Sequence, residues 1–122
     1  MSDDVHNWND DQPIYRQLIE EVVAGILDER YREGELLPSV RQLADDYQVN
    51  ALTAAKAYRE LARDGLTDKR RGEGLAVKTG ARDALLLRER TKFLEEEWPA
   101  LRARLRRMEI DPKDLLEPSE SK

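Results

Sequence analysis

Residues 37–78, LPSVRQLADDYQVNALTAAKAYRELARDGLTDKRRGEGLAVK, decide how this chain folds. The stretch opens on Ser39-Val40-Arg41-Gln42, which fits a capping box, where a serine side chain accepts a hydrogen bond from a backbone N–H in the first helical turn. Apolar residues then recur with the i, i+3, i+4, i+7 spacing of one helix face, at Val40, Leu43, Ala44 and Tyr47. The pattern predicts a short helix.

A second short helix follows after a turn at Gln48-Val49. Asn50 is a favoured residue at a helix start, and Gly65 stands where glycine commonly ends a helix. The same apolar spacing recurs between them at Ala54, Ala57, Tyr58 and Leu61, while the opposite face carries Leu52, Lys56, Arg59 and Arg63. The sequence therefore predicts a helix-turn-helix over about residues 40–59.

Beyond the second helix the pattern changes to that of a hairpin. Residues 66–70 and 75–78 can pair as strands around the tip Arg71-Gly72-Glu73-Gly74, because glycines permit the positive φ angles of tight turns. Three cations crowd beside the tip, at Lys69, Arg70 and Arg71. A helix-turn-helix followed by a basic hairpin, here a wing over about residues 66–78, is the layout of a winged helix-turn-helix DNA-binding domain.

At these residues the chain resembles the GntR family of bacterial transcription regulators. The matching elements are Pro13-Ile14-Tyr15, Leu37-Pro38-Ser39-Val40-Arg41-Gln42-Leu43-Ala44, Val49-Asn50, Thr53, Lys56-Ala57-Tyr58-Arg59-Glu60-Leu61, Asp64-Gly65-Leu66 and Arg70-Arg71-Gly72-Glu73-Gly74. The short C-terminal region resembles the YtrA-like branch, whose members carry a small helical dimerisation region in place of a large effector domain. The resemblance implies a mainly α fold with a small β-hairpin: a winged helix-turn-helix at 12–80, then a helical dimerisation region at 81–117.

Composition excludes several classes of function. The chain of 122 residues has no cysteine and one histidine, His6, which leaves no disulfide, thiolate metal site or Ser-His-Asp triad. Its start lacks the basic and apolar regions of a signal peptide, and no apolar run is long enough to span a membrane. We therefore expect a cytoplasmic, non-enzymatic protein with no cofactor, no metal and no membrane partner.

Charge is distributed unevenly along the chain. The net charge is −5, made up of −7 in residues 1–35, +3 in residues 36–82 and −1 in residues 83–122. The positive charge is concentrated at the helix-turn-helix and the wing, as a nucleic-acid interface requires despite the acidic total.

The N-terminal 35 residues divide into a tail and a helix. Residues 1–11 are polar and acidic without any periodic pattern, which predicts a mobile, disordered tail, although Trp8 could pack on the domain. A wide apolar face from about residue 13 to 31 predicts the supporting first helix, with Pro13 in its first turn.

The C-terminal region shows a heptad repeat over residues 81–108. Large apolar residues recur in it at Leu87, Leu94, Trp98, Leu101, Leu105 and Met108. The stripe either pairs with the same helix of a second subunit, which we favour, or folds back on its own domain. Pro99 should kink or restart the helix near Trp98. A short helix at 112–117 and a frayed tail at 118–122 are expected after it.

The family resemblance implies DNA contacts at named positions. Arg41 matches the family's base-reading arginine, which can bind guanine O6 and N7. Asn50 and Thr53 are placed for base or phosphate hydrogen bonds, although Asn50 could serve only as a cap. Lys56 and Arg59 are expected at phosphates, and Gly72 could offer its N–H to a phosphate while Arg71 enters the minor groove or binds the backbone. The remaining predicted DNA-binding residues are Leu52, Lys69, Arg70 and Gly74.

Leu52 stands where many relatives have a polar residue, so it either packs on a thymine methyl or is buried by a slight rotation of the helix. The function predicted is that of a sequence-specific transcriptional regulator, a homodimeric repressor of an inverted-repeat operator in double-stranded DNA. The alternative is a winged-helix protein-interaction module. The sequence does not decide whether a small-molecule effector binds.

Overall fold

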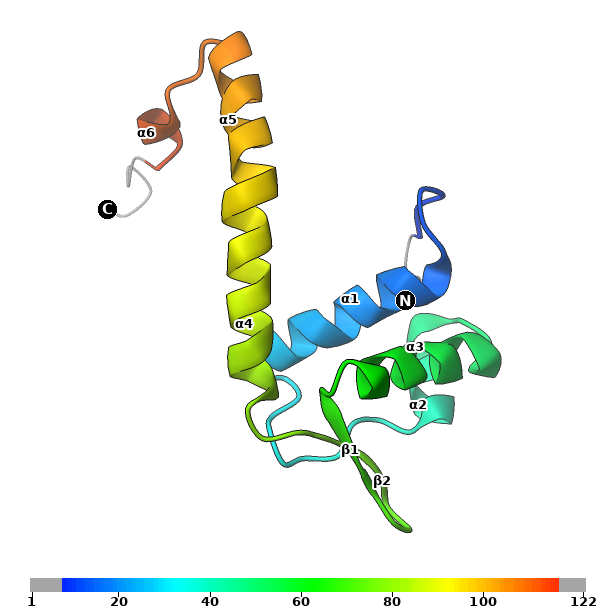
Figure 1. The fold of residues 1–122 in the computed structure, drawn as a ribbon. Helices are drawn as coiled ribbons and strands as arrows, with labels where there is room; N and C mark the ends of the chain where they lie inside the picture. Colours follow the sequence, from blue (N-terminus) through cyan, green and yellow to red (C-terminus); the bar gives the residue numbers. More distant parts are fainter. Residues whose placement is uncertain (1–7, 117–122) are drawn as a thin grey trace, which may run out of the picture. The chain divides into compact units, whose positions relative to one another are not determined.

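The computed structural model describes residues 8–116 and divides the chain into two compact units, Met1–Leu85 and Leu86–Lys122. The elements of the first unit are α1 (Ile14–Leu27), α2 (Val40–Tyr47), α3 (Ala51–Arg63), β1 (Thr67–Arg70), β2 (Gly74–Val77) and the start of α4 (Ala81–Lys92). The second unit continues α4 through a π-helical segment, η2 (Phe93–Glu97), into α5 (Trp98–Arg107) and α6 (Pro112–Leu115). The fold is mainly helical with one hairpin, as the sequence predicts (Figure 1).

The core of the first unit forms where α1 and α2 both pack on α3 (Figure 1). The apolar positions that predict the helices are the buried ones, and the fully covered side chains are Leu18, Val22, Ile26, Leu43, Ala54, Ala57 and Leu61. Ala81 and Leu85 of α4 join the same core. Burial of one face of each helix explains why the 3.6-residue period predicts them correctly.

Side chains cap both helices of the helix-turn-helix. The Ser39 hydroxyl accepts from the Gln42 N–H at 3.0 Å, and the Asn50 side-chain oxygen accepts from the Thr53 N–H at 2.8 Å. The Gln42 side chain does not complete the capping box, because its amide donates instead to Asp46 Oδ1 at 2.8 Å. Gln48 ends α2 in the left-handed conformation, with a φ of 57°.

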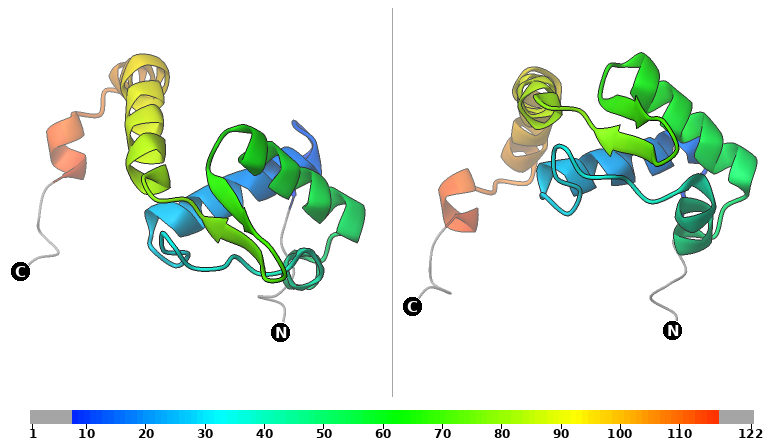
Figure 2. Two further views of the ribbon diagram at one scale, coloured as in Figure 1. Left: turned by 60° about the horizontal axis from the view of Figure 1, so that its bottom comes forward. Right: turned by 90° about the horizontal axis from the view of Figure 1, so that it is seen from below.

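The wing is an antiparallel pair in which Thr67 faces Val77 and Arg70 faces Gly74. The segment leading into α2 runs beside it (Figure 2), where Leu37 N–H donates to Leu75 O at 2.7 Å and Val77 N–H donates to Glu35 O at 3.0 Å. These bonds fasten the wing to the base of the helix-turn-helix. Compared with the expected strands, 66–70 and 75–78, β1 begins one residue later, and β2 begins and ends one residue earlier.

The N-terminal segment differs from the expected mobile tail at residues 8–11; residues 1–7 of that tail lie outside the described range. The half-buried Trp8 ring lies 6.3 Å from the Tyr47 ring, centre to centre. The buried Gln17 side chain accepts from Asn9 N–H and donates to Asn9 O and Gln12 O, at 2.8–3.0 Å. A polar residue without apolar periodicity thus holds this segment on α1.

The second unit restarts its helix where Pro99 predicts a disturbance. Trp98 N–H bonds to Phe93 O, five residues earlier, and α5 begins at Trp98. Proline has no N–H and its ring clashes with the carbonyl four residues before it, so a wider turn ahead of Pro99 relieves the clash. Asp111 then caps α6. This helix, expected over residues 112–117, ends at Leu115 in the structure; residue 117 and the expected tail at 118–122 lie outside the described residues.

Candidate nucleic-acid interface

The outward face of α3 carries most of the residues predicted to contact DNA. Leu52 is 80% exposed, so its burial by a rotation of the helix is ruled out. Lys56 and Arg59 are exposed one and two turns later, and Thr53 is half-buried. Arg63 is exposed and pairs with Glu60 at 3.6 Å. Leu52, Lys56 and Arg59 therefore form an open surface on one side of the helix.

The N-terminal end of α3 meets the start of α1. The Lys56 ammonium lies 4.3 Å from the centre of the Tyr15 ring, a cation–π distance. An open depression of about 390 Å³ lies here. It is lined by Pro13, Ile14, Tyr15, Asn50, Leu52, Thr53 and Lys56. Tyr15 was not among the residues predicted at the interface, although it belongs to Pro13-Ile14-Tyr15, one of the elements that resemble the family.

The wing exposes all of its predicted contact residues, but they differ in their partners. Arg70 donates from Nη2 to Gly34 O at 2.6 Å, so its side chain is bound to the segment before α2. Arg71 makes no hydrogen bond or ion pair within residues 8–116. Gly74 has a φ of 129°, and a Cβ at this position would meet no atom within 4 Å, so its backbone conformation, and not space, requires glycine. Gly72 occupies the tip with a φ of 79°.

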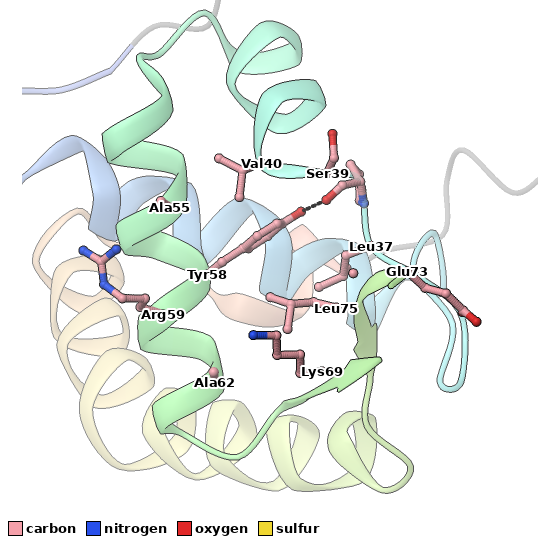
Figure 3. A pocket seen from close by; sticks show the side chains of 12 residues that line it. Leu37, Ser39, Val40, Ala55, Tyr58, Arg59, Ala62, Lys69, Glu73 and Leu75 are labelled. Carbon is pink, nitrogen blue, oxygen red and sulfur yellow. Dashed lines mark hydrogen bonds between the residues drawn. The ribbon is translucent and has the colours of Figure 1, made fainter. Parts of the chain in front are cut away.

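A cavity of about 450 Å³ lies between α3, the start of α2 and the wing (Figure 3). Its lining includes the cationic residues Arg59 and Lys69. The Tyr58 hydroxyl donates to Pro38 O at 2.6 Å. Burial raises the pKa of Tyr58 far above its ordinary value, so this phenol stays a neutral donor. Arg41 is exposed in the first turn of α2 and makes no side-chain hydrogen bond within residues 8–116.

Residues 14–77 match the sequence profile of the bacterial regulatory proteins of the gntR family, over more than half of the chain. The chain belongs to this family. The resemblance predicted from the helix-turn-helix and wing residues is therefore confirmed.

Individual relatives agree with the family assignment. The HTH-type transcriptional repressor YtrA of Bacillus subtilis is 36% identical over 84 residues, 69% of this chain and 65% of that protein. The chain thus covers less than two thirds of this relative's length. A GntR family transcriptional regulator from Listeria monocytogenes has a TM-score of 0.71 at 23% identity, covering 94% of this chain and 99% of that one, which shows the shared fold. The AraR DNA-binding domain in complex with operator ORX1 has a TM-score of 0.55 at 25% identity, over 60% of this chain and 93% of that one.

This GntR-family chain also exposes an apolar stripe in its second unit. Of the predicted dimerisation residues, Leu87 is 69% exposed, Leu94 55% and Leu101 38%, while Leu105 is buried. Met108 is exposed and Trp98 is half-buried. Phe93 and Leu86 are further exposed apolar residues that the heptad repeat left out. Most of this apolar surface is exposed in the described part of the chain.

The described residues also bear on metal and membrane binding. No three histidine, cysteine, aspartate or glutamate side chains between residues 8 and 116 converge on a point that could hold a metal ion. None of the helices described there has the length and apolar content needed to cross a bilayer.

Proposed function

We propose that this GntR-family protein is a homodimeric, sequence-specific DNA-binding repressor and not an enzyme. One observation carries the proposal. The first unit presents exposed cationic side chains on α3 and on the wing, together with polar side chains at the start of α3. Two relatives support it: one is named as a transcriptional repressor, and the other is a DNA-binding domain solved with its operator.

The roles divide by side-chain chemistry. Arg41 reads a guanine, and Thr53 hydrogen-bonds a base edge or phosphate beside it. The Asn50 side-chain oxygen already accepts the Thr53 N–H, so its amide NH₂ group and the second lone pair of the oxygen remain for DNA. The exposed Leu52 side chain packs on a thymine methyl. The DNA phosphates are contacted by Lys56, Arg59, Lys69, Arg71 and the N–H of Gly72.

The exposed apolar residues of the second unit support a dimer, because a helix with such a surface gains stability by burying it. Two copies related by a two-fold axis present two recognition helices. The operator is then an inverted repeat with half-sites about one helical turn apart. Pairing makes the second binding event intramolecular, which raises affinity by about 10²–10⁴.

Selection of bound fragments from genomic DNA, followed by a salt titration on the recovered site, tests the proposal. We expect an enriched inverted repeat and an affinity that falls by about 10³–10⁵ between about 50 and 200 mM salt, if six to ten phosphates are contacted. Arg71→Gln should reduce the salt slope, whereas Arg63→Gln, at an exposed position outside the proposed contacts, is the matched control. Recovery of no enriched sequence would reject the proposal in favour of a protein-interaction module.

A further inference from the structure

The cavity between α3, the start of α2 and the wing has the dimensions and lining of a small-molecule site. Its volume of about 450 Å³ lies within the usual range for ligand pockets. All three elements that line it belong to the first unit. In Figure 3 the residues that line it come from α3, from the wing and from the segment before α2.

One part of the cavity is apolar and held in place. Leu37 and Tyr58 are almost fully buried, and Val40 and Leu75 are half-buried beside them. The bond from the Tyr58 hydroxyl to Pro38 O fixes the ring across the floor (Figure 3). A preformed apolar floor of this kind favours a ligand with an apolar part. Inorganic phosphate has no such part.

The other part is cationic. Lys69 contributes a positive charge, and its side chain makes no hydrogen bond or ion pair within residues 8–116, whereas the guanidinium of Arg59, also in the lining, is directed to the other side of α3 in Figure 3. In Figure 3 the Lys69 ammonium points towards α3, whereas the Glu73 carboxylate points away from the cavity. The unsatisfied charge of the lining is thus positive, which complements an anionic group on the occupant.

We propose that this cavity binds a small organic carboxylate with an aromatic or similarly bulky apolar body, and that the occupant competes with DNA. The competition rests on the proposed function, in which Arg59 and Lys69 contact the DNA backbone. Because ligand and phosphate would use the same Lys69 ammonium, binding of one excludes the other. The apparent DNA dissociation constant then rises by the factor 1 + [L]/Kd, about elevenfold when the ligand is at ten times its Kd.

The site is tested with 2-naphthoate as the probe and 2-naphthamide as its uncharged counterpart. Titration of the full chain, followed by amide chemical shifts, should show saturable shifts in the lining residues for the carboxylate and much weaker ones for the amide. Ala62→Leu fills the cavity from α3 and should abolish binding. Ala51→Leu adds the same atoms to the same helix outside the lining and should leave probe binding unchanged.

Lys69→Gln supplies a second variant that does not alter the cavity's volume greatly. It should weaken binding of 2-naphthoate and leave the weak binding of 2-naphthamide as it was. Equal binding of carboxylate and amide to the parent protein, or unchanged binding by Ala62→Leu with its helix content intact, would overturn the proposed site.

Competition is measured on the operator recovered by selection. 2-Naphthoate should raise the apparent operator dissociation constant of the parent protein by the factor 1 + [L]/Kd, where Kd is the value from the probe titration. It should leave the operator dissociation constant of Ala62→Leu unchanged. If the probe binds and the operator affinity stays constant, the competition is refuted while the DNA-binding function stands. If the protein without probe binds no DNA, the proposed function fails, and with it the competition, although the probe titration still decides the site.

Discussion

The ammonium nitrogen of Lys56 lies 4.3 Å from the centre of the Tyr15 ring, and this contact joins α3 to the first turn of α1. Both residues line the depression at the start of α3. A ring beneath the ammonium attracts it through the ring's quadrupole and restricts the flexible lysine stem. The contact therefore holds a proposed phosphate-binding charge at a fixed place beside Thr53.

Replacing Tyr15 should weaken DNA binding through Lys56. We expect Tyr15→Leu to cost about 0.5–1 kcal/mol of binding free energy, because an exposed cation–π contact has that magnitude. Tyr15→Phe keeps the ring and should bind like the parent protein. Operator affinity at one fixed salt concentration measures both, and equal losses in the two variants would show that the tyrosine hydroxyl matters instead of the ring.

Gln17 should contribute to stability through the N-terminal segment. Its buried side chain makes three hydrogen bonds to the backbone of Asn9 and Gln12, so Gln17→Ala should lower the free energy of unfolding by about 1–3 kcal/mol. Glu20→Ala, at an exposed position on the same helix, should change it by less than about 0.5 kcal/mol. Urea titrations compare the two, and equal small effects would mean that the segment adds no stability.

Arg41→Ala and Arg71→Ala should impair DNA binding in different ways. Loss of Arg41 should cost about 1–3 kcal/mol and relax the preference at one base pair per half-site. Loss of Arg71 should weaken all sites more evenly, since it has no partner among residues 8–116 and stands at the wing tip. Affinities for an operator and its single-base variants separate the two patterns, and a changed base preference in Arg71→Ala would place that side chain in a groove.

The helices of the helix-turn-helix were predictable because local and tertiary preferences agree in them. The apolar spacing at Leu43 and Ala44, or at Ala57 and Leu61, marks the face that the fold buries. Ser39 and Asn50 cap the helices that follow them. The wing was predictable for a similar reason, since few residues other than glycine tolerate its turn.

Features that depend on contacts distant in the sequence were not predictable in the same way. Neither Gln17 nor Arg70 belongs to an apolar pattern, and their partners are reached only once the chain is folded. The pairing of Tyr15 with Lys56 joins two helices across the core. Pro99 predicted a disturbance, but the π-helical form it takes has no apolar period of its own.

The π-helical segment changes which apolar residues share a face in the second unit. A π turn holds about one residue more than an α turn, so residues after Phe93–Glu97 are rotated by roughly 100° relative to a continuous α-helix. Trp98, Leu101 and Leu105 then align with Phe93 and Leu86. The heptad repeat read along a continuous helix had aligned them with Leu94 and Leu87.

Self-association should therefore respond to Phe93 more than to Leu87. Phe93→Glu places a charge in the aligned stripe and should shift the protein towards monomer at micromolar concentration. Leu87→Glu adds the same charge at the more exposed position and should leave the dimer intact. Sedimentation velocity measures both, with helix content by circular dichroism as the check on folding.

If Leu87→Glu dissociates the dimer and Phe93→Glu does not, the interface follows the continuous heptad and the wide turn is absent from the dimer. A monomeric parent protein would instead reject the homodimer, and operator binding by Phe93→Glu as tight as that of the parent would separate DNA affinity from pairing.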